Sequence, residues 1–388
     1  MKKLLFITAL FLANFFTPSF CQVAAQNISF ENVSEGLSHN RVTAIVQDTR
    51  GFLWIGTYSG LNRYDGISYK TYSSGEQPNS LPGNEIRDLL LDDNGDLWIA
   101  TGGGLAKYNM ETDDFKVWRS EDGDLLHNVI IDIELDDQGI IWVGTEAGLN
   151  TVKDDTVERI SGVPNRRVSA LAHVGSAIWA SIDAEIFVVD KRSLRVSPLD
   201  LGDYEWQAVA FCMLGSSDGS VWLGTSGYGL FHISFRNGRY SVEEYRHNPN
   251  DPNSIANDRM LSLLRDNSGR IWIGTENGGL CLYRPQTNDF QRFQFDPLKT
   301  NTISSNSVWS IYQDRSDRLW VGTFNQGIDL YDPASKKFEH IYQRPGFAYG
   351  LSNNAVSSFQ FISDDEVWIG TVGGWLNIWD PIINSFQV

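Results

Sequence analysis

The sequence predicts an all-β fold, a β-propeller of four-stranded antiparallel blades, on the basis of three observations. A short segment centred on tryptophan occurs eight times, with 37 to 50 residues between successive tryptophans, a period typical of propellers and solenoids. Apolar residues within each copy follow a period of two, which indicates strands. The 388 residues include 35 glycines, as many tight turns require. The eight segments are LWIGT at Trp54, LWIAT at Trp98, IWVGT at Trp142, IWASI at Trp179, VWLGT at Trp222, IWIGT at Trp272, LWVGT at Trp320 and VWIGT at Trp368.

The sixth copy shows the four strands that each repeat is expected to form. A nearly continuous apolar run at 259–264 predicts an inner strand, and the turn at 266–269 ends it. The second and third strands are expected at 271–275 and 280–283, and a polar, alternating fourth strand at 290–293. Packing such blades face to face would bury each tryptophan between neighbouring sheets. The glycine two residues after the tryptophan would let the next sheet approach closely, so we interpret these tryptophans as structural.

The fourth copy departs furthest from the pattern. Trp179 is followed by Ala-Ser-Ile in place of the usual apolar-Gly-Thr, and its distance from the preceding tryptophan is the shortest of the series. We therefore expect a thinner fourth blade, in which Trp179 is the tryptophan most tolerant of substitution.

The sequence is compatible with two ways of closing the ring. Residues 28–33 alternate like the fourth strands expected at 115–118 and 338–341, and such a strand before the first blade can complete the last sheet of a ring. The eighth copy, however, already has a fourth strand of its own at 384–388. Residues 26–388 are thus expected to form either an eight-bladed ring, or a seven-bladed ring followed by the first blade of a second.

Residues 1–25 are expected to be a signal peptide. Lys2 and Lys3 precede an apolar run from Leu4 to Phe16, and the small residues 23–25 offer a cleavage site before Gln26; cleavage after Cys21 is an alternative. The apolar run is too short to span a bilayer. We expect an exported, periplasmic chain with no membrane span.

The net charge argues against nucleic-acid binding, and the positions of the cysteines argue against a disulfide. The formal net charge is −17, and −19 once Lys2 and Lys3 are removed, so the surface would repel phosphate backbones and nucleic acid is not an expected partner. Cys212 and Cys281 fall on strands of different rank in neighbouring copies. They are interpreted as small buried hydrophobes rather than as a disulfide.

The first repeat carries a resemblance to a known family. The stretches at 35–42, 47–57 and 60–66, EGLSHNRV, QDTRGFLWIGT and GLNRYDG, resemble the opening repeat of two-component regulator propellers, and the resemblance covers residues 27–388. These propellers form the extracytoplasmic sensor region of hybrid histidine kinases, many of them from gut Bacteroidetes that respond to glycan fragments. In that family two seven-bladed propellers usually precede a β-sandwich, a membrane helix, a kinase and a response regulator. The resemblance implies ligand sensing, and we expect no kinase activity in the present chain.

One face of the ring is expected to carry the ligand site. Loops between second and third strands share this face with loops that lead into first strands, and ligands of propellers bind there near the axis. Aromatic rings can stack on sugars, while amides and guanidinium groups can bond hydroxyls or uronate carboxylates, so the expected partner is an oligosaccharide or other small ligand. A second propeller or a homodimer partner is also considered. The wider set on this face includes Arg41, Tyr58, Arg87, Arg166, Arg167 and Arg259. The selected site, where aromatics and amides are densest, comprises Tyr228, Glu276, Asn277, Trp309, Phe324, Asn325 and Gln326.

Catalytic patterns are weak. The six histidines show no metal-binding spacing, and the segment 93–98 resembles the Asp-box turn of sialidases, which is a hairpin feature and not a catalytic one. No catalytic residue, metal or cofactor is therefore expected. The alternative function is a propeller-fold polysaccharide hydrolase or lyase.

Overall fold

The computed structural model describes residues 28–387, apart from 203, 237, 300, 336–340, 344–349 and 382–384. The chain divides after Pro333 into two units. The first unit contains seven four-stranded antiparallel sheets and the second contains one. The expected signal peptide, residues 1–25, lies outside the described residues. No described segment forms an apolar helix of membrane-spanning length.

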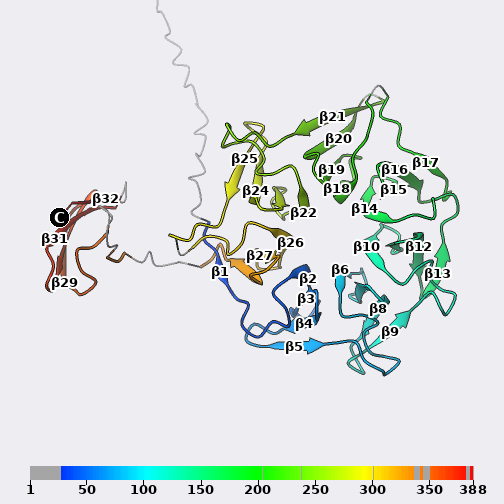
Figure 1. Cartoon of the computed structure of the whole chain (residues 1–388), viewed down its shortest axis with the longest axis horizontal. Helices are drawn as coiled ribbons and strands as arrows, with labels where there is room; N and C mark the ends of the chain where they lie inside the picture. The colour runs from blue at the N-terminus through cyan, green and yellow to red at the C-terminus, as the bar shows by residue number, and fades with distance from the viewer. Residues whose placement is uncertain are drawn as a thin grey trace, which may run out of the picture. The chain divides into compact units, whose positions relative to one another are not determined.

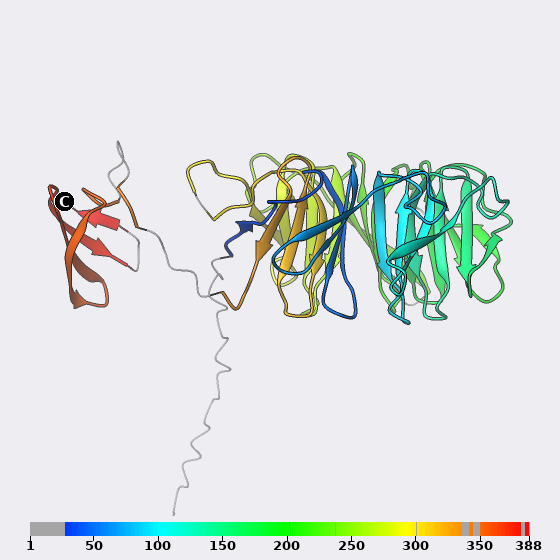
Figure 2. The same cartoon turned by 90° about the horizontal axis from the view of Figure 1, so that it is seen from below.

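The seven sheets of the first unit are the blades of a ring (Figure 1), which Figure 2 shows from the side. In each blade the first strand lies nearest the axis and later strands lie further out. Blades 1 to 3 consist of β2 (Val42–Gln47), β3 (Leu53–Thr57), β4 (Gly60–Tyr64) and β5 (Tyr69–Tyr72); β6 (Ile86–Leu91), β7 (Leu97–Thr101), β8 (Gly104–Asn109) and β9 (Asp114–Trp118); and β10 (Ile130–Leu135), β11 (Ile141–Thr145), β12 (Gly148–Lys153) and β13 (Thr156–Arg159).

The remaining blades follow the same order. Blades 4 to 6 consist of β14 (Val168–Val174), β15 (Ala177–Ile182), β16 (Glu185–Asp190) and β17 (Val196–Pro198); β18 (Ala210–Gly215), β19 (Val221–Thr225), β20 (Leu230–Arg236) and β21 (Arg239–Tyr245); and β22 (Met260–Arg265), β23 (Ile271–Thr275), β24 (Gly279–Arg284) and β25 (Asp289–Phe293). Blade 7 consists of β26 (Val308–Gln313), β27 (Leu319–Thr323), β28 (Ile328–Tyr331) and the N-terminal strand β1 (Glu31–Asn32).

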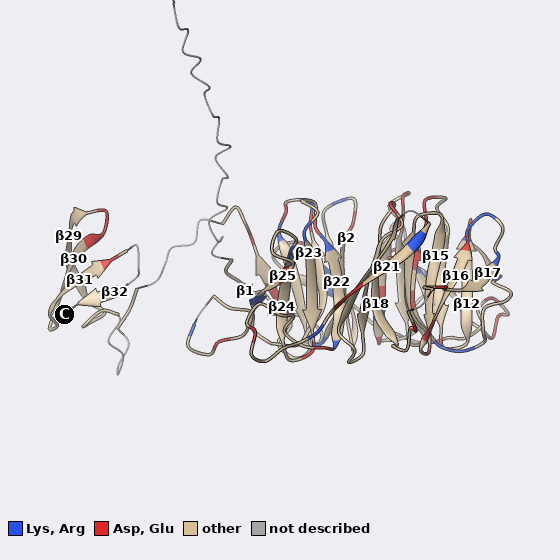
Figure 3. Cartoon of the chain, turned by 90° about the horizontal axis from the view of Figure 1, so that it is seen from above, with Lys and Arg blue, Asp and Glu red and all other residues tan. Residues whose placement is uncertain are grey.

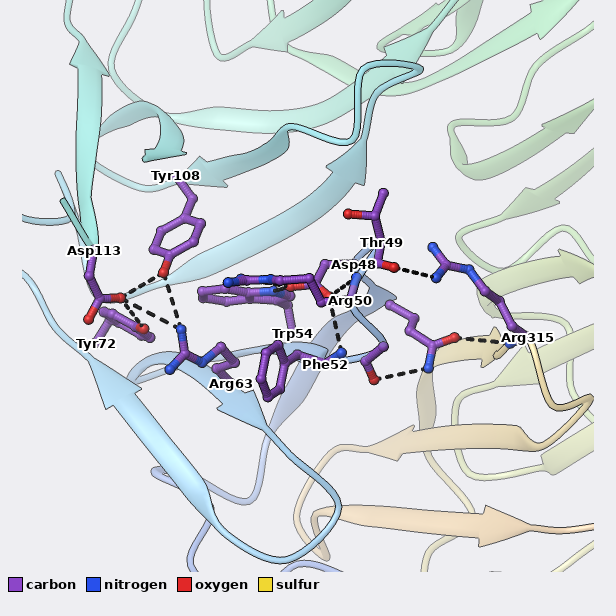
Figure 4. A network of polar contacts seen from close by, with 12 residues as sticks. Asp48, Thr49, Arg50, Phe52, Trp54, Arg63, Tyr72, Tyr108, Asp113 and Arg315 are labelled. Carbon is purple, nitrogen blue, oxygen red and sulfur yellow. Dashed lines mark hydrogen bonds and ion pairs between the residues drawn. The ribbon is translucent and has the colours of Figure 1, made fainter. Parts of the chain in front are cut away.

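The second strand of every blade in the ring is buried, as expected. Trp54 is fully buried, and its indole N–H donates to Asp48 Oδ2 at 3.0 Å (Figure 4). The other carboxylate oxygen of Asp48 accepts the backbone N–H groups of Arg50 and Phe52, which closes the turn before the strand. The same bond to the indole recurs at 2.9 Å in blades 2, 3, 6 and 7. The aspartates of these turns are therefore structural.

The glycine of the repeat is required by the neighbouring blade. A Cβ added at Gly274 would lie 2.6 Å from the carbonyl oxygen of Val308 in blade 7, and one added at Gly322 would lie 2.6 Å from Val42 Cγ1 in blade 1. Any side chain at these positions would push the sheets apart. This confirms the expected close approach between neighbouring sheets.

The fourth blade keeps four strands. Its two inner strands, β14 and β15, are as long as those of other blades, and only the outer strand β17 is short, with three residues. The expectation of a thinner blade thus holds for the outer strand alone. Trp179 is 2% exposed and packs edge-on against Tyr240, so it is buried like its counterparts.

The N-terminal strand closes the ring with seven blades. β1 pairs antiparallel to β28, with Glu31 opposite Leu330 and Asn32 opposite Asp329. On the other side of blade 7, Arg315 Nη1 donates to the carbonyl oxygen of Thr49 at 3.0 Å (Figure 4). We call this junction between blades 7 and 1 the seam. Of the two arrangements that the sequence allows, the ring is the seven-bladed one; most of the strand expected at 338–341 lies outside the described residues.

The second unit is a single sheet. It consists of β29 (Val356–Ser363), β30 (Glu366–Thr371), β31 (Leu376–Asp380) and β32 (Ser385–Gln387). Its core contains Leu351, Val367 and Ile369. Trp368, however, is 38% exposed, so the expectation that every repeated tryptophan is buried between blades is wrong here. The physical reason is that the described residues of this unit supply one sheet and no second sheet to cover the indole.

The two cysteines of the ring are free thiols. Cys281 is buried, and this burial raises the pKa of its thiol to about 11. Cys212 is partly buried, and desolvation raises the pKa of its thiol as well. Both therefore act as small apolar residues, as expected.

Candidate functional site

Every inner strand of the ring carries a β-bulge at its second residue. A bulge redirects a side chain relative to the regular alternation of a strand. The bulged residues of all seven blades line one cavity of about 540 Å³, the axial cavity. They are Thr43, Arg87, Ile131, Ser169, Phe211, Leu261 and Trp309.

A second cavity, of about 680 Å³, lies at the seam. It is lined by residues 37–41, which lead into β2, by Tyr58 after β3, and by Phe324 and Asn325 after β27. Arg41 and Tyr58 line this seam cavity and the axial cavity alike. The two hollows therefore adjoin on the face where first strands begin.

Arg41 is surrounded by aromatic rings from both sides of the seam. Its guanidinium carbon lies 4.2 Å from the ring centroid of Phe324, 4.7 Å from that of Tyr58 and 5.1 Å from that of Trp309. The rings of Trp309 and Phe324 lie 5.6 Å apart. Cation–π attraction of this kind fixes a guanidinium without neutralising it. Tyr58 is nevertheless 46% exposed and Phe324 38% exposed, so both present ring surface to a ligand.

Three of the seven selected residues come together at this place. Trp309 lines the axial cavity, and Phe324 and Asn325 line the seam cavity. With Arg41 and Tyr58 they form what we call the seam site.

The other four selected residues lie outside both cavities. Tyr228, in blade 5, is half-exposed beside Arg246. Glu276 pairs with Arg259 at 2.9 Å. Asn277, at a φ of 58°, exchanges hydrogen bonds with Ser307 of the next blade at 3.1 Å. The carbonyl oxygen of Gln326 accepts hydrogen bonds from the side chains of Asn32 and Ser34, so its backbone holds the segment that closes the ring.

The selected set omitted Arg41 and Tyr58, although the wider set contained both. Their role depends on contact between the first and seventh copies, 251 residues apart from Tyr58 to Trp309, which exists only in a ring of seven. The repeat count left that number open. A search restricted to the first and last blades of each possible ring could have paired them.

Partly buried carboxyls line the axial cavity on one side. Asp88, Asp132 and Glu134 each accept a backbone N–H from the inner strand of the following blade, at 3.2, 2.6 and 3.1 Å. Burial, together with the charge of Asp132, raises the pKa of Glu134 to about 8. Burial also raises the pKa values of Asp88 and Asp132, and Asp88 is further raised by its neighbour Asp132. These groups tie blades 2, 3 and 4 together. Across the described part of the chain, no three His, Cys, Asp or Glu residues are placed to hold a metal ion.

Comparison with known families identifies the repeat. The family model "Two component regulator propeller" matches five segments, residues 36–59, 80–103, 124–147, 254–277 and 302–325. These segments contain the tryptophan cores of the first, second, third, sixth and seventh copies.

Solved structures share the fold. The extracellular domain of a protein described as the hybrid two component system BT3049 of B. thetaiotaomicron is 25% identical, with a TM-score of 0.74 over 93% of this chain and 49% of that one. The corresponding domain of BT4673 from the same organism is 22% identical, with a TM-score of 0.62 over 93% of this chain and 53% of that one. Virginiamycin B lyase from Staphylococcus aureus, 15% identical, has a TM-score of 0.59 over 78% of this chain and 98% of its own, a likeness of fold alone.

The present chain is shorter than the Bacteroides domains with which it was compared. The present chain spans about half the length of the two Bacteroides domains that it matches. A search among curated proteins finds no sequence match. The repeats and the fold together show that this chain carries two-component regulator propeller repeats and is similar in structure to the extracellular domains of Bacteroides hybrid two component systems.

Proposed function

We propose that this chain is the periplasmic, ligand-sensing propeller of a hybrid two-component regulatory system, and that it binds an oligosaccharide at the seam site. The observation that carries the proposal is the group of exposed aromatic rings beside Arg41, at the point where two cavities adjoin. The similarity to extracellular domains of such systems supports the sensory part.

The seam site has the chemistry that sugars require. The exposed rings of Tyr58 and Phe324 offer flat apolar surfaces for the faces of pyranose rings. The Asn325 amide and the Arg41 guanidinium add donors for hydroxyl groups. A concave surface with a few converging polar groups is the usual form of a small-molecule site.

Signalling from such a site requires that the ligand favour one of two arrangements of the receptor. The seam site draws its residues from blade 1 and blade 7, so an occupant would contact both blades. We propose that this chain contributes the binding step, without kinase activity and without a nucleotide or cofactor.

The alternative, a polysaccharide hydrolase or lyase, has less support. The carboxyls with raised pKa values, Asp88, Asp132 and Glu134, are the natural candidates for acid catalysis. Each is partly buried, and one of its carboxylate oxygens accepts a backbone N–H of the next blade. They are thus committed to packing between blades.

Calorimetric titration of the purified chain with a panel of neutral and acidic oligosaccharides tests the proposal, with chromatographic analysis of the same mixtures for products. Saturable binding without turnover is the expected result, and product formation would favour the hydrolase or lyase. Replacing Trp309 and Phe324 together by Ala should abolish binding while the circular dichroism spectrum stays intact. The matched control is Tyr228→Ala, which removes an exposed ring outside both cavities. Unaltered affinity in the double variant would place the site elsewhere.

A further inference from the structure

We propose that the seam site is specific for an acidic oligosaccharide, one with a uronate residue whose carboxylate pairs with Arg41. This inference rests on the proposed function and names the class of sugar. Its starting point is a difference between Arg41 and the other four arginines of the wider set on that face.

Four of the five arginines in the wider set on this face are paired with a carboxylate. The pairs and their N–O distances are Arg87–Glu85 at 3.0 Å, Arg166–Asp183 at 2.7 Å, Arg167–Glu146 at 3.1 Å and Arg259–Glu276 at 2.9 Å. For Arg41, by contrast, the described residues supply neither an ion pair nor a hydrogen bond to the guanidinium. Aromatic rings take the place that a carboxylate has in the other four.

The aromatic surroundings leave the donors of Arg41 available. A ring attracts the cation through its π face and supplies no carboxylate oxygen, so the five N–H groups in the guanidinium plane remain free for an acceptor. That plane matches a carboxylate, which it can bind through two parallel hydrogen bonds. Arg41 is partly buried, and partial exclusion of water strengthens such a pair.

The cavity behind Arg41 does not oppose an anion, although the chain as a whole is acidic. Glu85, which also lines the axial cavity, is paired with Arg87. Burial raises the pKa values of Asp88, Asp132 and Glu134, which line the axial cavity, and so disfavours their charged forms. Acidic residues elsewhere on the ring are interspersed with basic ones (Figure 3). Among the five residues that form the seam site, only Arg41 carries a charge.

The same features argue for a sugar acid over a nucleic acid. A phosphate backbone binds through many cations, whereas the seam site offers one unpaired arginine and the chain carries a net charge of −17. A uronate oligosaccharide carries a carboxylate next to sugar rings that can stack on aromatic side chains. The seam site offers the matching groups, the guanidinium of Arg41 next to the exposed rings of Tyr58 and Phe324.

The experiment uses pairs of oligosaccharides that differ only in charge. Oligomers of galacturonate, glucuronate and mannuronate are each compared with their methyl esters by calorimetric titration at pH 7. At least one acid is expected to bind about tenfold or more tightly than its ester, because a carboxylate can accept two parallel, charge-assisted hydrogen bonds from a guanidinium and an ester cannot. The preference should weaken as salt is raised.

Variants assign the preference to one side chain. Arg41→Gln should bind acid and ester equally, while Arg41→Lys, which keeps the charge but loses the planar pair of donors, should retain part of the preference. Arg259→Gln, which removes an arginine that already has a partner, should keep the full preference. Thermal unfolding checks that each variant is folded.

The outcomes separate the two proposals. Equal binding of every acid and its ester by the unaltered chain would overturn the acidic specificity while leaving oligosaccharide binding intact. A preference that persists in Arg41→Gln would overturn the role of Arg41. Binding of no member, acidic or neutral, would contradict the proposed function itself, and the inference would fall with it.

Discussion

Replacement of Trp272 by Ala should destabilise the ring by about 3–5 kcal/mol, the usual cost of emptying a large buried aromatic site. Trp272 is 1% exposed and packs with Leu280, Val308 and Phe30 between blades 6 and 7. The substitution also removes the indole N–H that bonds to Asp266 at 2.9 Å. With an unfolding entropy of roughly 2.1 cal/mol/K per residue, a ring of about 300 residues should melt about 5–8 °C lower.

Differential scanning calorimetry measures this shift, and the chain contains its own control. Trp368 has the same place in the repeat but is 38% exposed in the second unit, so Trp368→Ala should leave the main transition of the ring in place. A shift below about 2 °C for Trp272→Ala, or equal shifts for the two variants, would refute the view that blades are held together by this tryptophan layer.

Two further perturbations address the polar interior. Asp266→Ala should cost about 1–3 kcal/mol in urea unfolding, because it leaves the buried indole N–H of Trp272 without its acceptor; a cost below 0.5 kcal/mol would show that this bond contributes little. Glu134 has a folded pKa of about 8 against an ordinary value of 4.5, so the folded state holds more protons and stability should fall as pH rises from 4.5 to 8. Glu134→Gln should remove part of that decline, up to about 1.4 kcal/mol per pH unit, and identical pH profiles of the two proteins would contradict the raised pKa.

The blades could be predicted from the sequence because the information that specifies them is local. The period of two, the turn residues and the repeated tryptophan place a strand at 271–275, and the structure has β23 at Ile271–Thr275. The requirement for Gly274 follows from the same reasoning, since the next blade carries the same repeat.

The number of blades in the ring is not local information. It depends on β1, which pairs through two residues with a strand nearly 300 residues away, and no pattern in six residues can specify that partner. The exposure of Trp368 has the same origin, because burial of a repeat requires a neighbour that its own sequence does not encode.

Residue type alone selected Trp309, Phe324 and Asn325, which the structure places on the linings of the two cavities. Glu276 and Asn277 are residue types equally suited to a ligand site, but Glu276 forms an ion pair with Arg259 and Asn277 forms hydrogen bonds with Ser307. Whether a side chain on a loop is free for a ligand is a property of its neighbours in space.

The pairing of β1 with β28 is the shortest strand pairing described in the ring. Within blade 7, β1 and β28 share two partner pairs, Glu31–Leu330 and Asn32–Asp329, whereas the other neighbouring strands of the ring share at least three. Bonds from the Val33 N–H to the Ile328 carbonyl oxygen and from Asn32 and Ser34 to Gln326 add to this attachment. The segment that carries this pairing continues directly into residues 37–41, which line the seam cavity. An occupant that contacts Tyr58 of blade 1 and Phe324 of blade 7 would bridge the seam between these two blades. By thermodynamic linkage, binding of the occupant would oppose opening of the ring at the seam. Opening of the ring would weaken binding of the occupant by the same factor.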